Sequence, residues 1–179
     1  MKKNKNAIFI TFDDTYFSFF KACINSIKKN YPNYPELLVC YTGKRQYVFD
    51  FLSSISRLRL IRTVSLSDKY SLNEPGEVKS LLIYQRYRLW STEFSEYGNI
   101  LHLDADTLIL KPLNHLFDLK TFFILKNNNG KIFWEEFRRN KSLKKILKED
   151  GLDYPEKLED LLNAGVFMIT SKMRRTKRQ

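Results

Sequence analysis

The chain has 179 residues, which is enough for one domain with a sizeable core but short for two independent domains. Its composition, 43% hydrophobic and 15% aromatic, excludes a disordered polypeptide. Lysine and arginine outnumber the acids by 31 to 20, and the resulting net charge of +11 makes phosphate-bearing partners and anionic surfaces relevant.

Much of this charge lies at the two ends of the chain, where residues 1–6 form a basic extension and residues 171–179 a basic tail. Such runs are more often solvated than bound, although the tail offers a means of peripheral membrane contact. No signal peptide is recognisable, and no apolar stretch reaches the roughly 20 residues of a transmembrane helix. We therefore expect no transmembrane anchor and a cytoplasmic location.

The first elements are a strand and a helix. Residues 7–11 are apolar and β-branched and stop at Asp13 and Asp14, which predicts a buried strand ending in a polar loop. A helix closed by Pro32 follows, because apolar residues recur at spacings of three and four: Phe17, Phe20, Ile24 and Ile27.

Strand and helix patterns continue to alternate along the chain. Strands are predicted at 37–41, 57–64 and 99–103, helices at 45–55 and 78–94, and a loop at 65–76. Further on come an extended stretch at 107–110, an apolar strand at 122–125, a turn at 127–130, a lysine-rich helical stretch to about 148, and a last strand at 165–170. The alternation predicts an α/β fold with a Rossmann-like mixed sheet, whose ligands bind outside the carboxyl ends of the strands, where Asp13 and Asp104 fall.

Asp104 and Asp106 lie two residues apart directly after the apolar run 100–103. An extended backbone would point both carboxylates to one face, where they could bind one divalent cation. Oxygen ligands of this kind suit Mg²⁺ or Mn²⁺, which commonly hold a substrate diphosphate. An isolated Asp-x-Asp is more often a solvated turn or cap, but the apolar segments on both sides favour a metal site.

Cysteine and histidine add no further metal site. Cys23 and Cys40 have neither metal-binding nor disulfide spacing and are expected to be buried thiols. His102 lies inside a strand and is expected to pack in the core, whereas His115 is expected to be exposed.

At this point the sequence resembles a known family. The run 100–110 with the following Pro112, and the later Asp160-Leu-Leu-Asn163-Ala-Gly-Val-Phe167, are similar to the glycogenin-like retaining glycosyltransferases of family 8, which have the GT-A fold. The similarity includes Thr11-Phe-Asp-Asp-Thr-Tyr16 and Arg86-Tyr-Arg88-Leu-Trp90 and covers about residues 7–170. It implies a single GT-A domain over that range.

The resemblance implies roles for the matching residues. Asp104 and Asp106 would bind Mn²⁺ or Mg²⁺, and the donor nucleotide would contact Thr11, Phe12, Asp13, Tyr16, Arg86, Asp104, Ala105 and Asp106. Asp160 and Asn163 match donor-sugar contacts and would be the catalytic residues. From the residues alone, Arg86 equally fits an exposed helix arginine, Asp160 a helix-end acid and Asn163 a turn former.

The implied activity is the transfer of a hexose from a nucleotide diphosphate sugar, UDP-linked by resemblance, to a hydroxyl of a glycan, protein or lipid-linked acceptor with retention of configuration. One departure stands out, because the family supplies a histidine metal ligand and a lysine beyond the last strand, whereas this sequence ends at Gln179. Either the chain is the N-terminal part of a longer catalytic domain, or water or a partner completes the site.

Two other functions stay open. A non-catalytic nucleotide-sugar-binding module would keep the cleft without the C-terminal ligand. A sugar nucleotidyltransferase would carry a glycine-rich basic loop, but residues 11–16 contain neither glycine nor lysine. A nucleic-acid partner is not expected, because core packing explains the aromatic residues better than a stacking platform: Phe17, Phe20, Phe49, Phe122 and Phe123.

Overall fold

The computed structural model describes residues 5–63, 85–86, 88–90, 92–118, 123–125 and 163–171. The chain divides into two compact units, one made of Met1–Phe123 with Gly165–Gln179 and the other of Ile124–Ala164. Nearly all described residues belong to the first unit. Several predicted segments lie wholly or partly outside the described residues: the loop at 65–76, about half of the helix at 78–94, the turn at 127–130, the lysine-rich stretch, and most of both basic ends.

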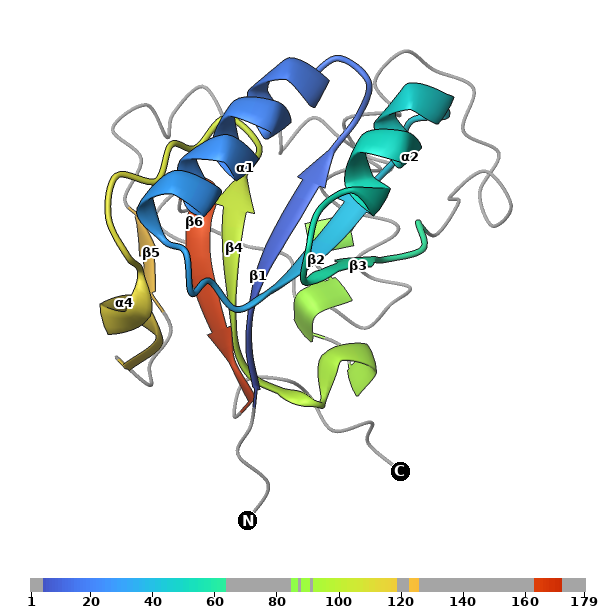
Figure 1. Ribbon diagram of the computed structural model, residues 1–179. Helices are drawn as coiled ribbons and strands as arrows, with labels where there is room; N and C mark the ends of the chain where they lie inside the picture. The colour runs from blue at the N-terminus through green and yellow to red at the C-terminus, as the bar shows by residue number, and fades with distance from the viewer. Residues whose placement is uncertain are drawn as a thin grey trace. The chain divides into compact units, whose positions relative to one another are not determined.

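A mixed sheet organises the described chain (Figure 1). Its strands are β1 (Lys5–Phe12), β2 (Glu36–Tyr41), β3 (Leu58–Leu60), β4 (Tyr97–Asp104), β5 (Phe123–Leu125) and β6 (Asn163–Thr170), in the order β3-β2-β1-β4-β6-β5. β1 pairs in parallel with β2 and β4, β2 pairs in parallel with β3, and β6 runs antiparallel to β4. The predicted α/β class with a mixed central sheet is confirmed.

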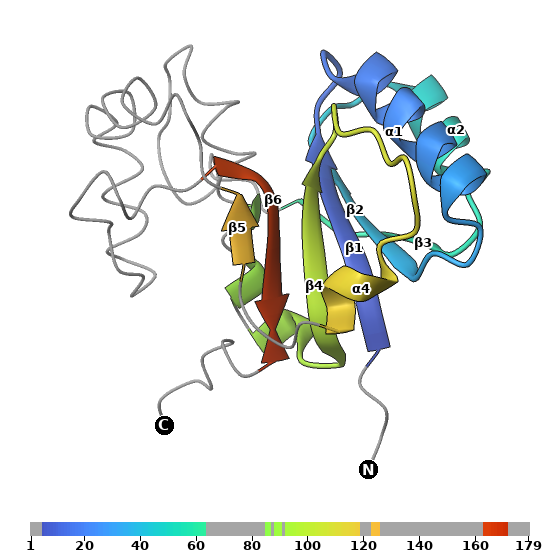
Figure 2. The same cartoon turned by 90° about the vertical axis from the view of Figure 1, so that its left-hand side faces the viewer.

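Two helices, α1 (Phe17–Asn30) and α2 (Gln46–Ser53), cover one face of β1, β2 and β4 (Figures 1 and 2). The apolar stripe of α1 is buried at Phe20, Ile24 and Ile27, as its spacing predicts. Every residue of β1 from Ala7 to Phe12 is buried, so the opposite face of this strand is covered too. There Phe9 packs edge-to-face on Phe94, with ring centroids 6.1 Å apart.

Several predictions about which side chains are buried or exposed are confirmed. Cys23 and Cys40 are buried free thiols. His102 is fully buried and stacks on Phe167 at a centroid distance of 4.6 Å, whereas His115 is exposed. Among the predicted core aromatics, Phe20 is buried while Phe17 and Phe49 are partly buried against the same cluster; Phe122 and the side chain of Phe123 lie outside the description.

The segment after β4, expected to be extended at 107–110, is not a strand of the sheet. It turns back along α1 (Figure 2). The Asn30 side-chain amide donates to the Ile109 carbonyl at 2.7 Å, and the Ile109 amide donates to the Ser26 hydroxyl at 2.9 Å. Ile109 is buried, but Leu108 and Leu110 are exposed.

Other boundaries also differ from the expectation. The third strand covers only Leu58–Leu60 of the predicted 57–64. The predicted helix at 78–94 ends in two 3₁₀ turns, η1 (Arg88–Trp90) and η2 (Thr92–Phe94), and the short helix α4 (Asn114–Asp118) was not predicted. Across the described residues, every helix is too short or too polar to cross a lipid bilayer.

Candidate active site at the carboxyl ends of β1 and β4

Two parallel strands bring the candidate residues to one edge of the sheet. Thr11 near the end of β1 is opposite Asp104, the last residue of β4, in the strand register. Asp13 follows β1 directly. Because parallel strands end at the same side, the polar residues that follow them share the crevice in which α/β proteins bind ligands. The structure confirms that Asp13 and Asp104 lie at the carboxyl ends of β1 and β4, as predicted.

Arg86 forms an ion pair with Asp104, in which Nη2 of Arg86 donates to Oδ1 of Asp104 at 2.6 Å. The two side chains are only 21% and 29% exposed. Burial raises the pKa of Asp104, the Arg86 guanidinium opposes that rise, and the negative charge of Asp106 adds to it. Arg86 is thus a partly buried residue paired with the carboxylate at the end of β4, rather than an exposed helix arginine.

Asp106 lies on a turn, and the extended backbone expected for this pair is wrong beyond Asp104. The Thr107 amide donates to the Asp104 carbonyl at 3.0 Å, which closes a turn through Ala105 and Asp106. Ala105 is buried against the core, and Asp106 is exposed. The two carboxylates nevertheless interact, since Asp106 contributes to the raised pKa of Asp104.

Two buried polar groups at this edge lack a hydrogen-bond partner among the described residues: the Thr11 hydroxyl and Nε of Arg86. Leaving a buried donor or acceptor without a partner is costly. Both groups flank Asp104, Thr11 through the strand register and Arg86 through the ion pair. A polar ligand at this edge would supply the missing hydrogen bonds.

The other residues predicted to contact the nucleoside, Asp13, Tyr16 and Phe12, differ in burial and contacts. Oδ1 of Asp13 accepts hydrogen bonds from the amides of Thr15 and Tyr16 at 2.9 and 3.1 Å and so shapes the loop before α1. Tyr16 is 43% exposed and leans against Phe19. Phe12 is fully buried and stacks on Phe20 at 4.0 Å, so its ring belongs to the core.

A second polar cluster, not identified from the sequence, lies at the ends of β1 and β2. The Tyr41 hydroxyl donates to Asp14, and Nε of Arg45 lies 3.7 Å from the same carboxylate. A Cβ atom on Gly43 would collide with both the Tyr41 hydroxyl and the Asp14 carboxylate. The only signal in the sequence was Gly43, two residues after the strand predicted at 37–41, which is consistent with a close approach of this kind.

The residues present fit a hard divalent cation. In the described parts of the chain no three side chains of the His, Cys, Asp and Glu types gather as a metal site. Asp104 and Asp106 nevertheless offer carboxylate oxygens at one strand end, and a cation there would relieve the repulsion between the two acids that is reflected in the pKa of Asp104. Two carboxylates with substrate phosphate oxygens and water are a usual Mg²⁺ or Mn²⁺ environment.

The two predicted catalytic residues are not placed by the structure. Asp160 lies outside the described residues. Asn163 is the first residue of β6, and the description there covers the backbone only.

Solved structures similar to this chain are glycosyltransferases. The galactosyltransferase LgtC, in complex with donor and acceptor sugar analogues, is 21% identical over 96% of this chain and 60% of its own, with a TM-score of 0.59. Mouse xyloside xylosyltransferase 1 is 12% identical over 97% of this chain and 70% of its own, with a TM-score of 0.61. GlyE of Streptococcus pneumoniae TIGR4 is 16% identical over 94% and 34%, with a TM-score of 0.54. A search of curated proteins gave no match.

These similarities show the fold, because the mixed central sheet matches that of GT-A glycosyltransferases. The family model described as glycosyl transferase family 8 matches residues 7–176, nearly the whole chain. The chain therefore belongs to glycosyl transferase family 8. It spans 60% of the length of LgtC.

Proposed function

We propose that this chain binds a nucleotide diphosphate sugar at the carboxyl ends of β1 and β4 and transfers its hexose to an acceptor hydroxyl with retention of configuration. UDP is the proposed nucleotide. The proposal rests on the Arg86–Asp104 ion pair at the end of β4, in a chain of glycosyl transferase family 8. Asp106 flanks this pair, as does the Thr11 hydroxyl, which has no hydrogen-bond partner among the described residues.

Asp104 and Asp106 would hold Mn²⁺ or Mg²⁺. Such an ion, when bound, neutralises charge that develops on the departing diphosphate. The half-buried position of Asp104 supports this role, because an acid placed where burial raises its pKa gains from a nearby positive charge.

Arg86 would bind the donor diphosphate. Its guanidinium is held at the site by one Nη2 contact to Asp104, while its buried Nε has no partner in the described chain. A guanidinium has five donors in a planar fork that matches phosphate oxygens. Arg86 can therefore keep its contact with Asp104 and still donate to a phosphate.

Thr11 and Tyr16 would contact the nucleoside. The Thr11 hydroxyl is buried opposite Asp104 and would exchange a hydrogen bond with the donor. The half-exposed ring of Tyr16 provides an apolar surface for a base to stack on. Asp13 holds the loop between them in shape through its two amide contacts.

Asp160 and Asn163 would contact the donor sugar, with the Asp160 carboxylate near the anomeric carbon. One fact supports this assignment: both residues fall within the family match. The acceptor is proposed to be a hydroxyl of a glycan, protein or lipid-linked sugar.

Isothermal titration of UDP with and without Mn²⁺, followed by a donor-hydrolysis and transfer assay, tests the proposal. We expect binding that depends on Mn²⁺, followed by turnover of a UDP-hexose. Binding without turnover would instead indicate a nucleotide-sugar-binding module. An absence of UDP binding at every Mn²⁺ concentration would refute both functions.

A further inference from the structure

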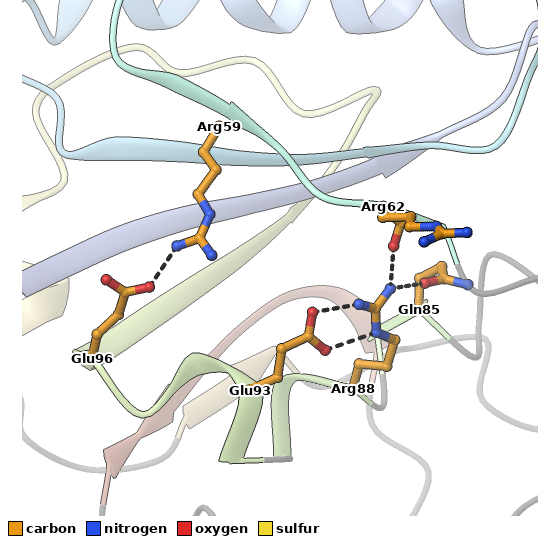
Figure 3. Close-up of polar contacts among 6 residues, drawn as sticks. All are labelled: Arg59, Arg62, Gln85, Arg88, Glu93 and Glu96. Atoms are coloured by element: carbon orange, nitrogen blue, oxygen red, sulfur yellow. Dashed lines mark hydrogen bonds and ion pairs between the residues drawn. The ribbon is translucent and has the colours of Figure 1, made fainter.

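Arg88, two residues after Arg86, has entirely different contacts (Figure 3). Its Nε donates to Oε2 of Glu93 at 3.0 Å, and its Nη2 donates to the other oxygen of the same carboxylate. This bidentate pair joins η1 to η2. The fork geometry makes such a pair more directional than a lysine contact.

The remaining terminal nitrogen of Arg88 makes two further contacts. Nη1 donates to the main-chain carbonyl of Arg62 at 2.7 Å and to the side-chain oxygen of Gln85. Gln85 is fully buried, and the Arg88 side chain is only 12% exposed. One guanidinium thus connects three pieces of chain: the end of the β3 region, the helical residues Gln85 and Arg86, and η2 (Figure 3).

Arg86 reaches Asp104 from the short helical piece that Gln85 shares. Since a flexible arginine loses rotamer freedom when it pairs, the pair forms most readily if its backbone is already fixed. We propose that Arg88 is a positioning residue, which through Gln85, Glu93 and the Arg62 carbonyl holds the backbone of Arg86 where its guanidinium meets Asp104 and the donor diphosphate. This inference rests on the proposed function of Arg86.

The chain offers a matched control in Arg59. This arginine also joins the β3 region to the chain before β4, because its Nη1 contacts Glu96 (Figure 3). The same Nη1 also contacts the Tyr97 hydroxyl. Tyr97 begins β4, whereas Asp104 ends it, so the Arg59 pair lies at the opposite end of the strand from the site. Replacing Arg59 removes another arginine–glutamate ion pair, a more exposed one, without touching the Arg86 segment.

A double-mutant cycle in UDP affinity, measured with Mn²⁺ present, tests the inference. Arg88→Ala should weaken UDP binding roughly three- to tenfold in the wild-type background and not at all in an Arg86→Ala background, because Arg88 acts through Arg86. Arg59→Ala should leave UDP affinity unchanged. An equal loss from Arg88→Ala in both backgrounds, or the same loss from Arg59→Ala, would overturn the inference. If Arg88→Ala does not fold, Glu93→Gln replaces it in the same cycle, with the same direction expected.

A second readout needs no ligand. The ¹⁵N order parameter of the Arg86 Nε–H should fall in Arg88→Ala and stay at its wild-type value in Arg59→Ala. If the wild-type chain binds no UDP, the proposed function fails, and this order parameter alone decides the inference. An unchanged Arg86 order parameter in Arg88→Ala would refute the positioning role.

Discussion

At the scale of single residues, two arginines that are only two positions apart in the sequence make different contacts. Arg86 faces the carboxylate at the end of β4, and Arg88 faces a carboxylate and a carbonyl of the surrounding scaffold. Residues two positions apart on a helix do not share a face, so a helical or 3₁₀ backbone sends them in different directions. One of them can bind ligand while the other holds the backbone in place.

Replacing Arg86 by alanine should therefore weaken binding of UDP with Mn²⁺ by about ten- to a hundredfold, since a charge-assisted hydrogen bond contributes about 1.5–3 kcal/mol. Arg59→Ala serves as the control, because it removes a surface ion pair far along β4. Titration calorimetry measures both. Equal UDP affinity in Arg86→Ala and wild type would exclude Arg86 from the donor site.

Gly43 is the second residue with a clear prediction. A Cβ atom there would collide with the Tyr41 hydroxyl and the Asp14 carboxylate, both of which belong to one hydrogen-bonded pair. Gly43→Ala should lower the free energy of unfolding by about 1–3 kcal/mol, the usual cost of overpacking. Lys44→Ala at the exposed neighbouring position should change it by less than about 0.5 kcal/mol. Urea unfolding measures the free energy of unfolding of both variants. Equal values would mean that the Tyr41–Asp14 pair moves aside for the added Cβ atom without strain.

At the scale of elements, α1 holds in place the segment that follows β4 and Asp106. Ser26 and Asn30 hold Ile109 through its amide and its carbonyl. Asp106 lies three residues earlier, within the turn that follows β4. The helix therefore limits where the second acid of the pair can move.

Ser26→Ala should reduce the hydrogen-exchange protection of the Ile109 amide, because that amide loses its acceptor. The expected change is about 0.5–1.5 kcal/mol in opening free energy. Asn25→Ala, at an exposed position of the same helix, should leave the protection unchanged. If both variants exchange like wild type, the anchoring of this segment does not depend on Ser26.

The elements that sequence reasoning predicted well are those with long, regular patterns. β1, α1, β2 and β4 follow from apolar runs and helical spacing, and the acids at the strand ends follow from where those runs stop. The apolar pattern at 107–110 did not indicate a buried segment of the sheet, because Leu108 and Leu110 are apolar yet exposed. Its course depends on two hydrogen bonds to a helix about 80 residues earlier, which no local pattern encodes.

The same reason applies to parts of the site. The Tyr41–Asp14 pair joins two strand ends 27 residues apart, and the division of roles between Arg86 and Arg88 depends on what each faces in space. α4 has five residues, too few for a helical period to emerge. Contacts between residues far apart in the sequence, rather than local propensity, determine each of these features.

At the scale of the whole molecule, buried thiols and phenols make the fold sensitive to alkaline pH. Burial raises the pKa of Cys23 and of Cys40 from 9.0 to about 12, and that of Tyr41 and Tyr97 from 10.0 to about 12. These groups ionise first in the unfolded chain, which then binds fewer protons than the native state. Stability is thus complete below about pH 9 and falls as the pH rises toward 12.

At pH 10 each thiol should cost about 1.4 kcal/mol of stability relative to pH 8, since its unfolded form ionises about one unit below that pH. The Cys23→Ala/Cys40→Ala variant should be less stable at pH 8, because it leaves cavities, but should lose stability less steeply from pH 8 to 10. Urea unfolding at each pH measures this slope. Identical slopes in variant and wild type would show that the thiols do not govern alkaline stability.

The central claim is that Asp104 and Asp106 hold a metal ion for a nucleotide donor, and UDP affinity as a function of Mn²⁺ concentration tests it most directly. Wild type, Asp104→Asn and Asp106→Asn are compared, with thermal melts alongside to verify folding. Asp106 is exposed on its turn, so Asp106→Asn should melt like wild type while its UDP binding loses Mn²⁺ dependence. Asp104→Asn should lose the same dependence and also the ion pair with Arg86. Equal UDP affinity of all three proteins at every Mn²⁺ concentration would contradict the metal site and the donor-binding role built on it.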